Sequence, residues 1–156
     1  MKTAVIYTRS AVQSQNSNAD TLMKQQETLK AYCSKHNIRI LASFQEYRSA
    51  NTSPRPELEG ALDFAMRNNV DYILFTEWSR ISRFVYDVID FIGLTRKNNI
   101  KAQAINQPLE FNAPDEIVMS NICHVVGTLV SESHSIRIKN GIKAAKARRE
   151  KGVRRI

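Results

Sequence analysis

The sequence predicts an α/β fold, with a mostly parallel sheet that has helices on both faces, followed by a long C-terminal helix. Short β-branched or apolar runs alternate with helical stretches of about a dozen residues or more, which is the pattern of right-handed strand–helix–strand units. The chain has 156 residues, 42% of them apolar, so it is long enough for one domain with a buried core. From residue 113 onward the pattern is helical almost to the end, which predicts the long helix.

Each element is predicted from local periodicity and from the residues at its ends. Four short apolar runs are expected strands: residues 3–8, 38–44, 72–76 and 102–105. Three stretches with apolar residues at helical spacing are expected helices: 20–36, 57–68 and 84–98. Asp20 is the expected N-cap of the first helix, and Pro56 opens the second. The polar, proline-containing segment 46–56 is an expected loop.

The net charge of +8 is concentrated at the C-terminal end. Residues 137–156 contain nine basic residues and one acid, so the other 136 residues are neutral overall. A neutral body with a basic arm is typical of a protein whose partner is an anionic polymer or surface.

The remaining composition predicts a cytoplasmic protein without metal or cofactor. Cys33 and Cys123 lack metal-ligand spacing and lie among apolar neighbours, which predicts reduced, buried thiols and no disulfide. The N-terminal apolar run stops at Tyr7, too short for a signal peptide, and no run of about 18 apolar residues indicates a membrane span. The three histidines are scattered, and no carboxylate cluster follows the strands.

Arginines follow three consecutive predicted strands. They are Arg9, next to Ser10, after the first strand, Arg48 and Arg55 after the second, and Arg80 and Arg83 after the third. Because the carboxyl ends of parallel strands meet at one edge of a sheet, we expect these side chains to gather there. Guanidinium groups bind phosphate oxygens and stabilise a pentacoordinate transition state, so a serine among them predicts metal-free phosphoryl transfer. The alternative is that each arginine is solvated or salt-bridged and that Ser10 is only a turn residue.

Three segments resemble the catalytic domain of the serine recombinases, the resolvase/invertase family. They are residues 7–11 (YTRSA), 53–58 (SPRPEL) and 77–83 (EWSRISR). The most specific match is the pair Arg80 and Arg83 after a hydrophobic strand, with Arg55 in its proline-flanked loop. The resemblance extends from about residue 3 to about residue 150.

The resemblance implies a resolvase-like fold and site-specific recombination of double-stranded DNA, with the protein acting as a homodimer and as a tetramer in the synaptic complex. In that family a serine attacks the DNA phosphate to give a 5′-phosphoserine intermediate and a free 3′-hydroxyl. By resemblance, Arg9, Arg55, Arg80 and Arg83 would bind and polarise the scissile phosphate. Gln15 and Ser49 would make supporting contacts. A protein of this kind would serve a mobile element and be associated with the nucleoid.

Two positions depart from the family pattern. The family places one residue between the arginine and the nucleophilic serine, so the nucleophile's usual position is Ala11, whereas the serine is Ser10. Either the loop presents Ser10, or the nucleophile has been lost, or Ala11 is an engineered replacement. We favour Ser10 as nucleophile because we expect the loop to leave the strand at this point. The second departure is Ser79, where many members have an aspartate.

The resemblance divides the chain into a catalytic and oligomerisation domain, residues 1–135, and a basic C-terminal helix, residues 136–156, with no separate DNA-binding domain. In the family this helix lies across the DNA minor groove. The basic residues expected to contact DNA are Arg137, Lys139, Lys143, Lys146, Arg148 and Arg149. Apolar residues between 117 and 136 predict a dimer interface on the same helix.

Two further hypotheses remain open. The first is a catalytically inactive DNA-binding or assembly module on the same fold, motivated by Ala11. The second is a small phosphate- or nucleotide-binding α/β protein with a basic tail, which the lack of a Gly-rich loop after the first strand disfavours.

Overall fold

A computed structural model of the chain describes residues 1–10, 17–48, 54–109, 124 and 127. The elements are β1 (Lys2–Ser10), α1 (Ser17–Lys35), β2 (Ile38–Tyr47), α2 (Pro56–Arg67), β3 (Tyr72–Phe75), a 3-10 turn η1 (Trp78–Arg80), α3 (Val85–Lys97) and β4 (Lys101–Ala104). The four strands form one sheet in the order β2-β1-β3-β4, and all neighbouring pairs are parallel. The predicted α/β class is confirmed, whereas the predicted C-terminal helix lies outside the described residues.

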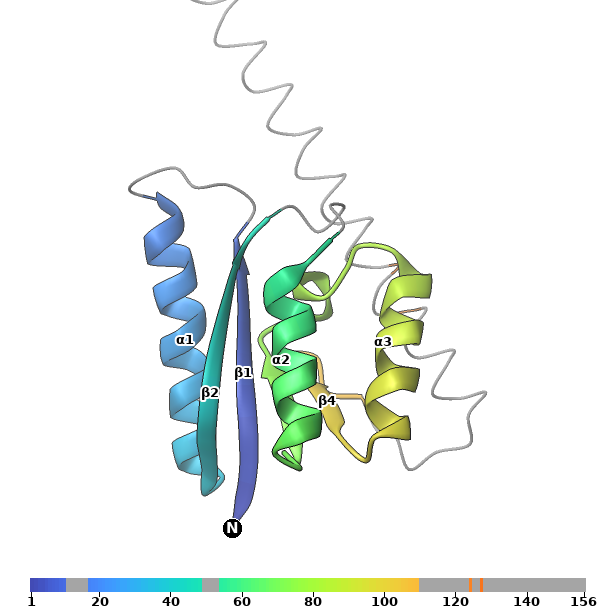
Figure 1. Cartoon of the computed structure of the whole chain (residues 1–156). Coiled ribbons are helices and arrows are strands. Elements are labelled where there is room, and N and C mark those ends of the chain that lie inside the picture. Colours follow the sequence, from blue (N-terminus) through green and yellow to red (C-terminus); the bar gives the residue numbers. More distant parts are fainter. Residues whose placement is uncertain (11–16, 49–53, 110–123, 125–126, 128–156) are drawn as a thin grey trace, which may run out of the picture.

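The sheet is the middle of three layers, with α1 on one face and α2 and α3 on the other (Figure 1). Alternate residues of β1 contribute to the two cores. Ala4 and Ile6 pack with Leu29 and Cys33 of α1. Val5 and Tyr7 belong to the larger core, whose helical members include Ala61 and Ala65 from α2 and Val88, Phe91 and Ile92 from α3. Successive side chains of β1 therefore point to opposite faces of the sheet.

Three boundaries differ from the sequence prediction by two or three residues. β1 continues through Ser10, paired with β2 at Arg9↔Glu46 and Ser10↔Tyr47, so the expectation that the loop leaves the strand at Arg9 is wrong. β2 likewise extends to Tyr47, so the predicted loop 46–56 begins too early. The polar side chains at the ends of β1 and β2 predicted loops, but the backbones of the two strands remain paired there. α1 begins at Ser17, so Asp20 lies inside the helix instead of capping it.

Two other predictions concern features outside the site. Cys33 is a free, buried thiol, as predicted, while Cys123 lies outside the described residues. None of the helices that the structure describes combines the length and hydropathy required to span a bilayer.

Helices α1, α2 and α3 share one way of ending. Asn37, Asn69 and Asn99 each follow the last residue of a helix by two positions and have positive φ angles of 52°, 49° and 56°. The amide of Val70, next to Asn69, donates to the Ala65 carbonyl at 3.0 Å, which satisfies a free carbonyl at the helix end. Asparagine tolerates this left-handed conformation better than most residues, so each helix turns promptly into the next strand.

Replacing Asn69 with valine should therefore lower the free energy of unfolding by about 1–2 kcal/mol, because a β-branched residue is strained at positive φ. Asn69→Gly, which removes the strain without adding contacts, should be as stable as the wild type or slightly more so. Urea denaturation followed by circular dichroism measures both. Equal midpoints for the valine and glycine variants would contradict this account.

Candidate active site

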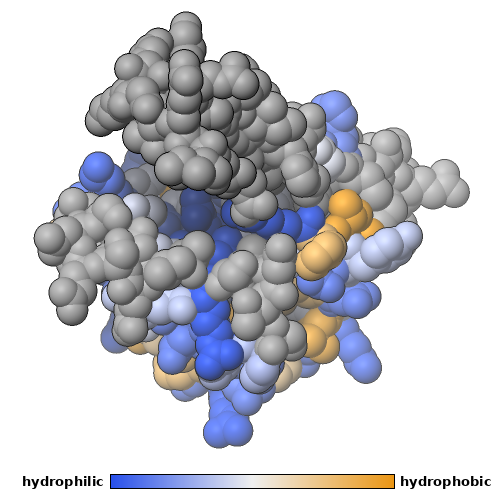
Figure 2. Space-filling model, turned by 90° about the horizontal axis from the view of Figure 1, so that it is seen from above, coloured by the Kyte–Doolittle hydropathy of each residue, from blue (hydrophilic) through white to orange (hydrophobic). Residues whose placement is uncertain are grey.

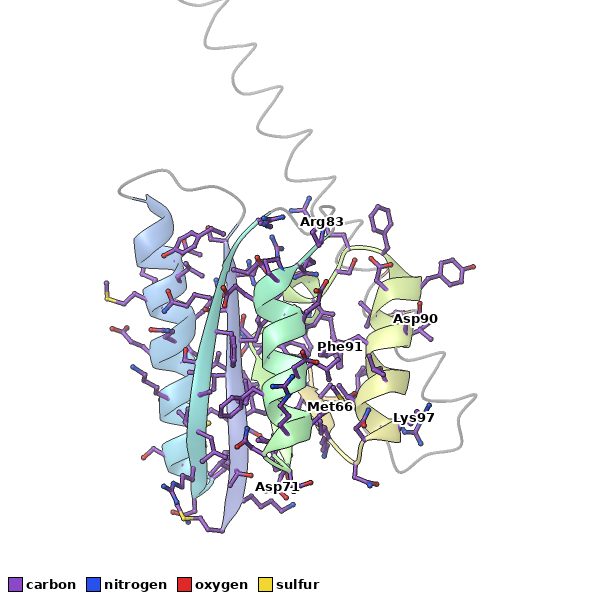
Figure 3. The ribbon with its side chains drawn as sticks, in the orientation of Figure 1. Met66, Asp71, Arg83, Asp90, Phe91 and Lys97 are labelled. Carbon is purple, nitrogen blue, oxygen red and sulfur yellow. The ribbon has the colours of Figure 1, made fainter. Side chains whose placement is uncertain are left out.

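The strand order reverses beside β1, because the chain passes to β2 on one side and to β3 on the other. In open parallel sheets, ligands bind outside the carboxyl ends of the strands at such a point. Arg9 is the second-last residue of β1, Arg80 ends the turn after β3, and Arg55 immediately precedes α2. Figure 2 looks onto this edge and shows hydrophilic residues gathered near its middle. Figure 3 places Arg83 at the same end of the molecule, and Asp71 at the opposite end.

Arg9 is held by backbone carbonyls of two different loops. Its Nε donates to the Arg80 carbonyl at 3.1 Å, Nη1 to the Arg48 carbonyl at 2.8 Å and Nη2 to the Ser79 carbonyl at 2.9 Å. The residue is only 3% exposed. Charge-assisted hydrogen bonds of this kind are strong, so Arg9 fastens the loops that follow β2 and β3 to the end of β1.

Gln25 of α1 holds the backbone of the same residue. The Arg9 amide donates to Gln25 Oε1 at 3.3 Å, and Gln25 Nε2 donates to the Arg9 carbonyl at 3.1 Å. This buried side-chain amide thus fixes the end of β1 from the α1 face.

Arg55 joins the larger core to the turn after β3. Its Nη2 donates to the Tyr7 hydroxyl at 2.7 Å and to the Arg80 carbonyl at 2.5 Å. Burial raises the pKa of Tyr7 to about 12, although the charge and the hydrogen bond of Arg55 act to lower it. Tyr7 therefore stays protonated at neutral pH.

Arg80 is held on two sides. Its Nη2 forms an ion pair with Glu77 Oε2 at 3.3 Å, and its Nη1 donates to the Arg9 carbonyl at 3.3 Å. Arg83, which follows it, is half-buried. Arg9, Arg55, Arg80 and Arg83 together form the arginine cluster.

The arginine cluster concentrates positive charge in a partly desolvated place. Burial, together with the charges of Arg55, Arg80 and Arg83, lowers the pKa of Arg9 to about 10. The Nε atoms of Arg55 and Arg80 are buried and have no hydrogen-bond partner among the described residues. Buried N–H donors without acceptors are costly, so the cluster is suited to an anion with several oxygen acceptors. The described residues contain no group of three or more histidine, cysteine, aspartate or glutamate side chains placed to hold a metal ion.

Ser10 lies next to the arginine cluster in sequence but on the other face of the sheet. It is 4% exposed, and the alternation along β1 places it on the face that α1 covers, opposite Arg9. Ala11, Gln15, Ser49 and the six basic residues predicted to contact DNA lie outside the described residues.

Several residues that shape the site had no predicted role. Glu46 is 2% exposed; its Oε2 accepts the Leu58 amide in the first turn of α2 at 3.4 Å, and its Oε1 lies 3.9 Å from Arg48 Nε. Tyr7, Gln25 and Glu77 complete this set. The alternation of β1 could have suggested Tyr7, because it lies two residues before Arg9 and therefore on the same face.

The comparisons with known proteins agree with this architecture. The sequence matches the family model of the resolvase N-terminal domain over residues 4–151. The N-terminal catalytic domain of TP901-1 integrase is similar, with a TM-score of 0.63 and 16% identity over 86% of this chain and 98% of that chain. A resolvase family site-specific recombinase from Streptococcus pneumoniae has a TM-score of 0.63 and 15% identity over 96% and 99% of the two chains.

A third similar structure is the C-terminal catalytic domain of ISC1926 TnpA, an IS607-like serine recombinase, with a TM-score of 0.60 and 19% identity over 86% and 97% of the two chains. No curated protein sequence matches the chain. At these identities the solved structures show a common fold, and the family model covers nearly the whole chain. The chain therefore belongs to the resolvase family of serine recombinases, and it matches the N-terminal catalytic domain of that family.

Proposed function

We propose that this domain cleaves and rejoins double-stranded DNA by metal-free phosphoryl transfer, with the arginine cluster binding the scissile phosphodiester. The observation that carries the proposal is the pair of buried Nε–H donors of Arg55 and Arg80, which lack acceptors among the described residues. A buried donor without a partner costs about 1–3 kcal/mol, so phosphate oxygens that accept from both would remove an existing penalty. Arg83 supplies a fourth charge at the same edge.

Ser10 is the proposed nucleophile. Its Oγ would attack phosphorus and form the Oγ–P bond while the bond from phosphorus to the 3′-oxygen breaks. The Oγ proton passes to solvent, the 3′-oxygen takes up a proton from solvent, and a 5′-phosphoserine link and a 3′-hydroxyl result. The arginines would stabilise the additional negative charge of the transition state. Because Ser10 lies on the α1 face, the end of β1 must turn after Arg9 for this attack.

The position of Ser10 also favours a second candidate function, a DNA-binding and assembly module without strand cleavage. In that case the arginine cluster would hold DNA phosphate, with no serine hydroxyl from β1 on its side. Both candidates include DNA contacts from Arg137, Lys139, Lys143, Lys146, Arg148 and Arg149, and both include a homodimer. The tetrameric synaptic complex belongs to the first.

Covalent capture distinguishes the two functions. The protein is incubated with a library of supercoiled plasmids carrying random inserts, denatured with detergent, and assayed for DNA that stays attached to protein. Wild-type protein should yield adducts, and Ser10→Ala should yield none, because the Oγ–P bond cannot form. Ala11→Ser, which places a hydroxyl at the family's usual position, should raise the yield. DNA binding by each variant is measured in parallel by fluorescence anisotropy.

Each result selects one function. DNA binding without adducts in the wild type would replace the recombinase by the assembly module. Adducts that persist in Ser10→Ala would exclude Ser10 as the nucleophile while leaving strand cleavage in place.

A further inference from the structure

Glu77 is a carboxylate held within the arginine cluster. Its Oε2 lies 3.3 Å from Arg80 Nη2 and accepts a hydrogen bond from Ser79 Oγ at 3.2 Å. Among the described residues it is the only acid that forms an ion pair with a member of the cluster. Its side chain is 35% exposed, so it faces solvent at the edge where a ligand would approach.

Two contacts fix this carboxylate at one side of the Arg80 guanidinium. Nη1 of the same guanidinium is taken by the Arg9 carbonyl, and Nε remains buried without a partner among the described residues. An anion that binds the exposed part of the Arg80 guanidinium, whose side chain is 24% exposed, therefore comes close to the Glu77 oxygens. The repulsion between that anion and Glu77 grows with the charge of the anion.

We propose that Glu77 shifts the selectivity of the arginine cluster away from dianions such as sulfate and toward singly charged phosphodiesters. This inference rests on the proposed function, because it concerns the same anion site. A phosphodiester carries one negative charge and is repelled once by Glu77, whereas a dianion is repelled twice. The four arginines attract the dianion more strongly than the diester, and the fixed carboxylate offsets more of this attraction for the dianion than for the diester. Glu77 thereby weakens the competition of free cellular dianions with DNA for this site.

The test compares two small anions on matched variants. Dimethyl phosphate represents the diester and sulfate the dianion, and both are titrated at neutral pH and constant ionic strength, with binding measured by calorimetry and by the shift in melting temperature. Glu77→Gln should strengthen dimethyl phosphate binding roughly fivefold and sulfate binding by roughly the square of that factor. Glu77→Asp keeps the charge and should retain the preference of the wild type. Glu27→Gln makes the same charge change on the exposed face of α1 and serves as the control.

The outcomes separate this inference from the proposed function. If the wild type binds dimethyl phosphate and Glu77→Gln gains equally for both anions, or loses affinity, the selectivity role is wrong while the anion site stands. If Glu27→Gln gains as much as Glu77→Gln, the effect is one of net charge and the inference is overturned. If neither anion binds any variant, the anion site itself is absent and the proposed function falls with it.

Discussion

Replacement of Arg80 by glutamine is expected to slow formation of the protein–DNA adduct by roughly 10²–10³-fold, which is the typical loss when one preorganised donor to a developing negative charge is removed. The Arg80 side chain offers a buried Nε–H with no partner among the described residues, and glutamine has neither the charge nor the fork. Arg55→Gln is expected to have an effect of similar size for the same reason. The rate is measured by quenching adduct formation in detergent at timed intervals.

Two controls accompany this experiment. Arg80→Lys keeps the charge but loses the planar fork, so its rate should lie between those of the wild type and the glutamine variant. Arg67→Gln removes an exposed charge at the end of α2 and should leave the rate unchanged. If Arg80→Gln reacts at the wild-type rate, the arginine cluster takes no part in the reaction.

The largest loss of stability is expected for Trp78→Ala, at about 3–5 kcal/mol in the free energy of unfolding. Trp78 is fully buried, and its ring meets the edge of Phe75 with centroids 4.9 Å apart. The indole Nε1 donates to the Gln107 carbonyl at 3.2 Å, and the Trp78 amide donates to Gln107 Oε1 at 3.2 Å. Removing the ring leaves a cavity beneath η1 and an unpaired carbonyl. Urea denaturation monitored by circular dichroism gives the value.

Trp78→Phe separates the two contributions, since it fills most of the cavity but lacks the indole donor. It should cost about 1–2 kcal/mol, mainly from the lost hydrogen bond. If Trp78→Ala costs no more than Trp78→Phe, the ring does not support the turn that places Ser79 and Arg80.

Periodicity and strand ends predicted the fold and the group of arginines because both follow from local rules. Arg9, Arg55 and Arg80 each lie just beside an element boundary, and parallel strands bring such boundaries together. The expectation that the loop leaves the strand before Ser10 was wrong, because β1 continues one pair beyond Arg9. Where the strand ends decides whether its side-chain alternation still applies to Ser10.

Contacts between residues far apart in the chain could not be predicted from the sequence, for a different reason. Glu46 appeared to be part of a polar loop, yet it is buried where β2 ends and accepts the Leu58 amide from α2. Tyr7 and Arg55 are 48 residues apart, and nothing local indicates that a core tyrosine would hold the guanidinium. Partnerships of this kind follow only from the packing of α2 against β1 and β2.

The Arg80 carbonyl accepts hydrogen bonds from both Arg9 and Arg55, so one main-chain oxygen is the junction between three elements. A peptide oxygen is present whatever amino acid occupies the position. Residue 80 can therefore be exchanged, even for a side chain carrying a spectroscopic label or a crosslinker, without removing the acceptor that orients its two neighbours. A substitution at position 80 removes the side-chain contacts with the Arg9 carbonyl and Glu77, but it leaves in place the main-chain oxygen that orients the guanidinium groups of Arg9 and Arg55.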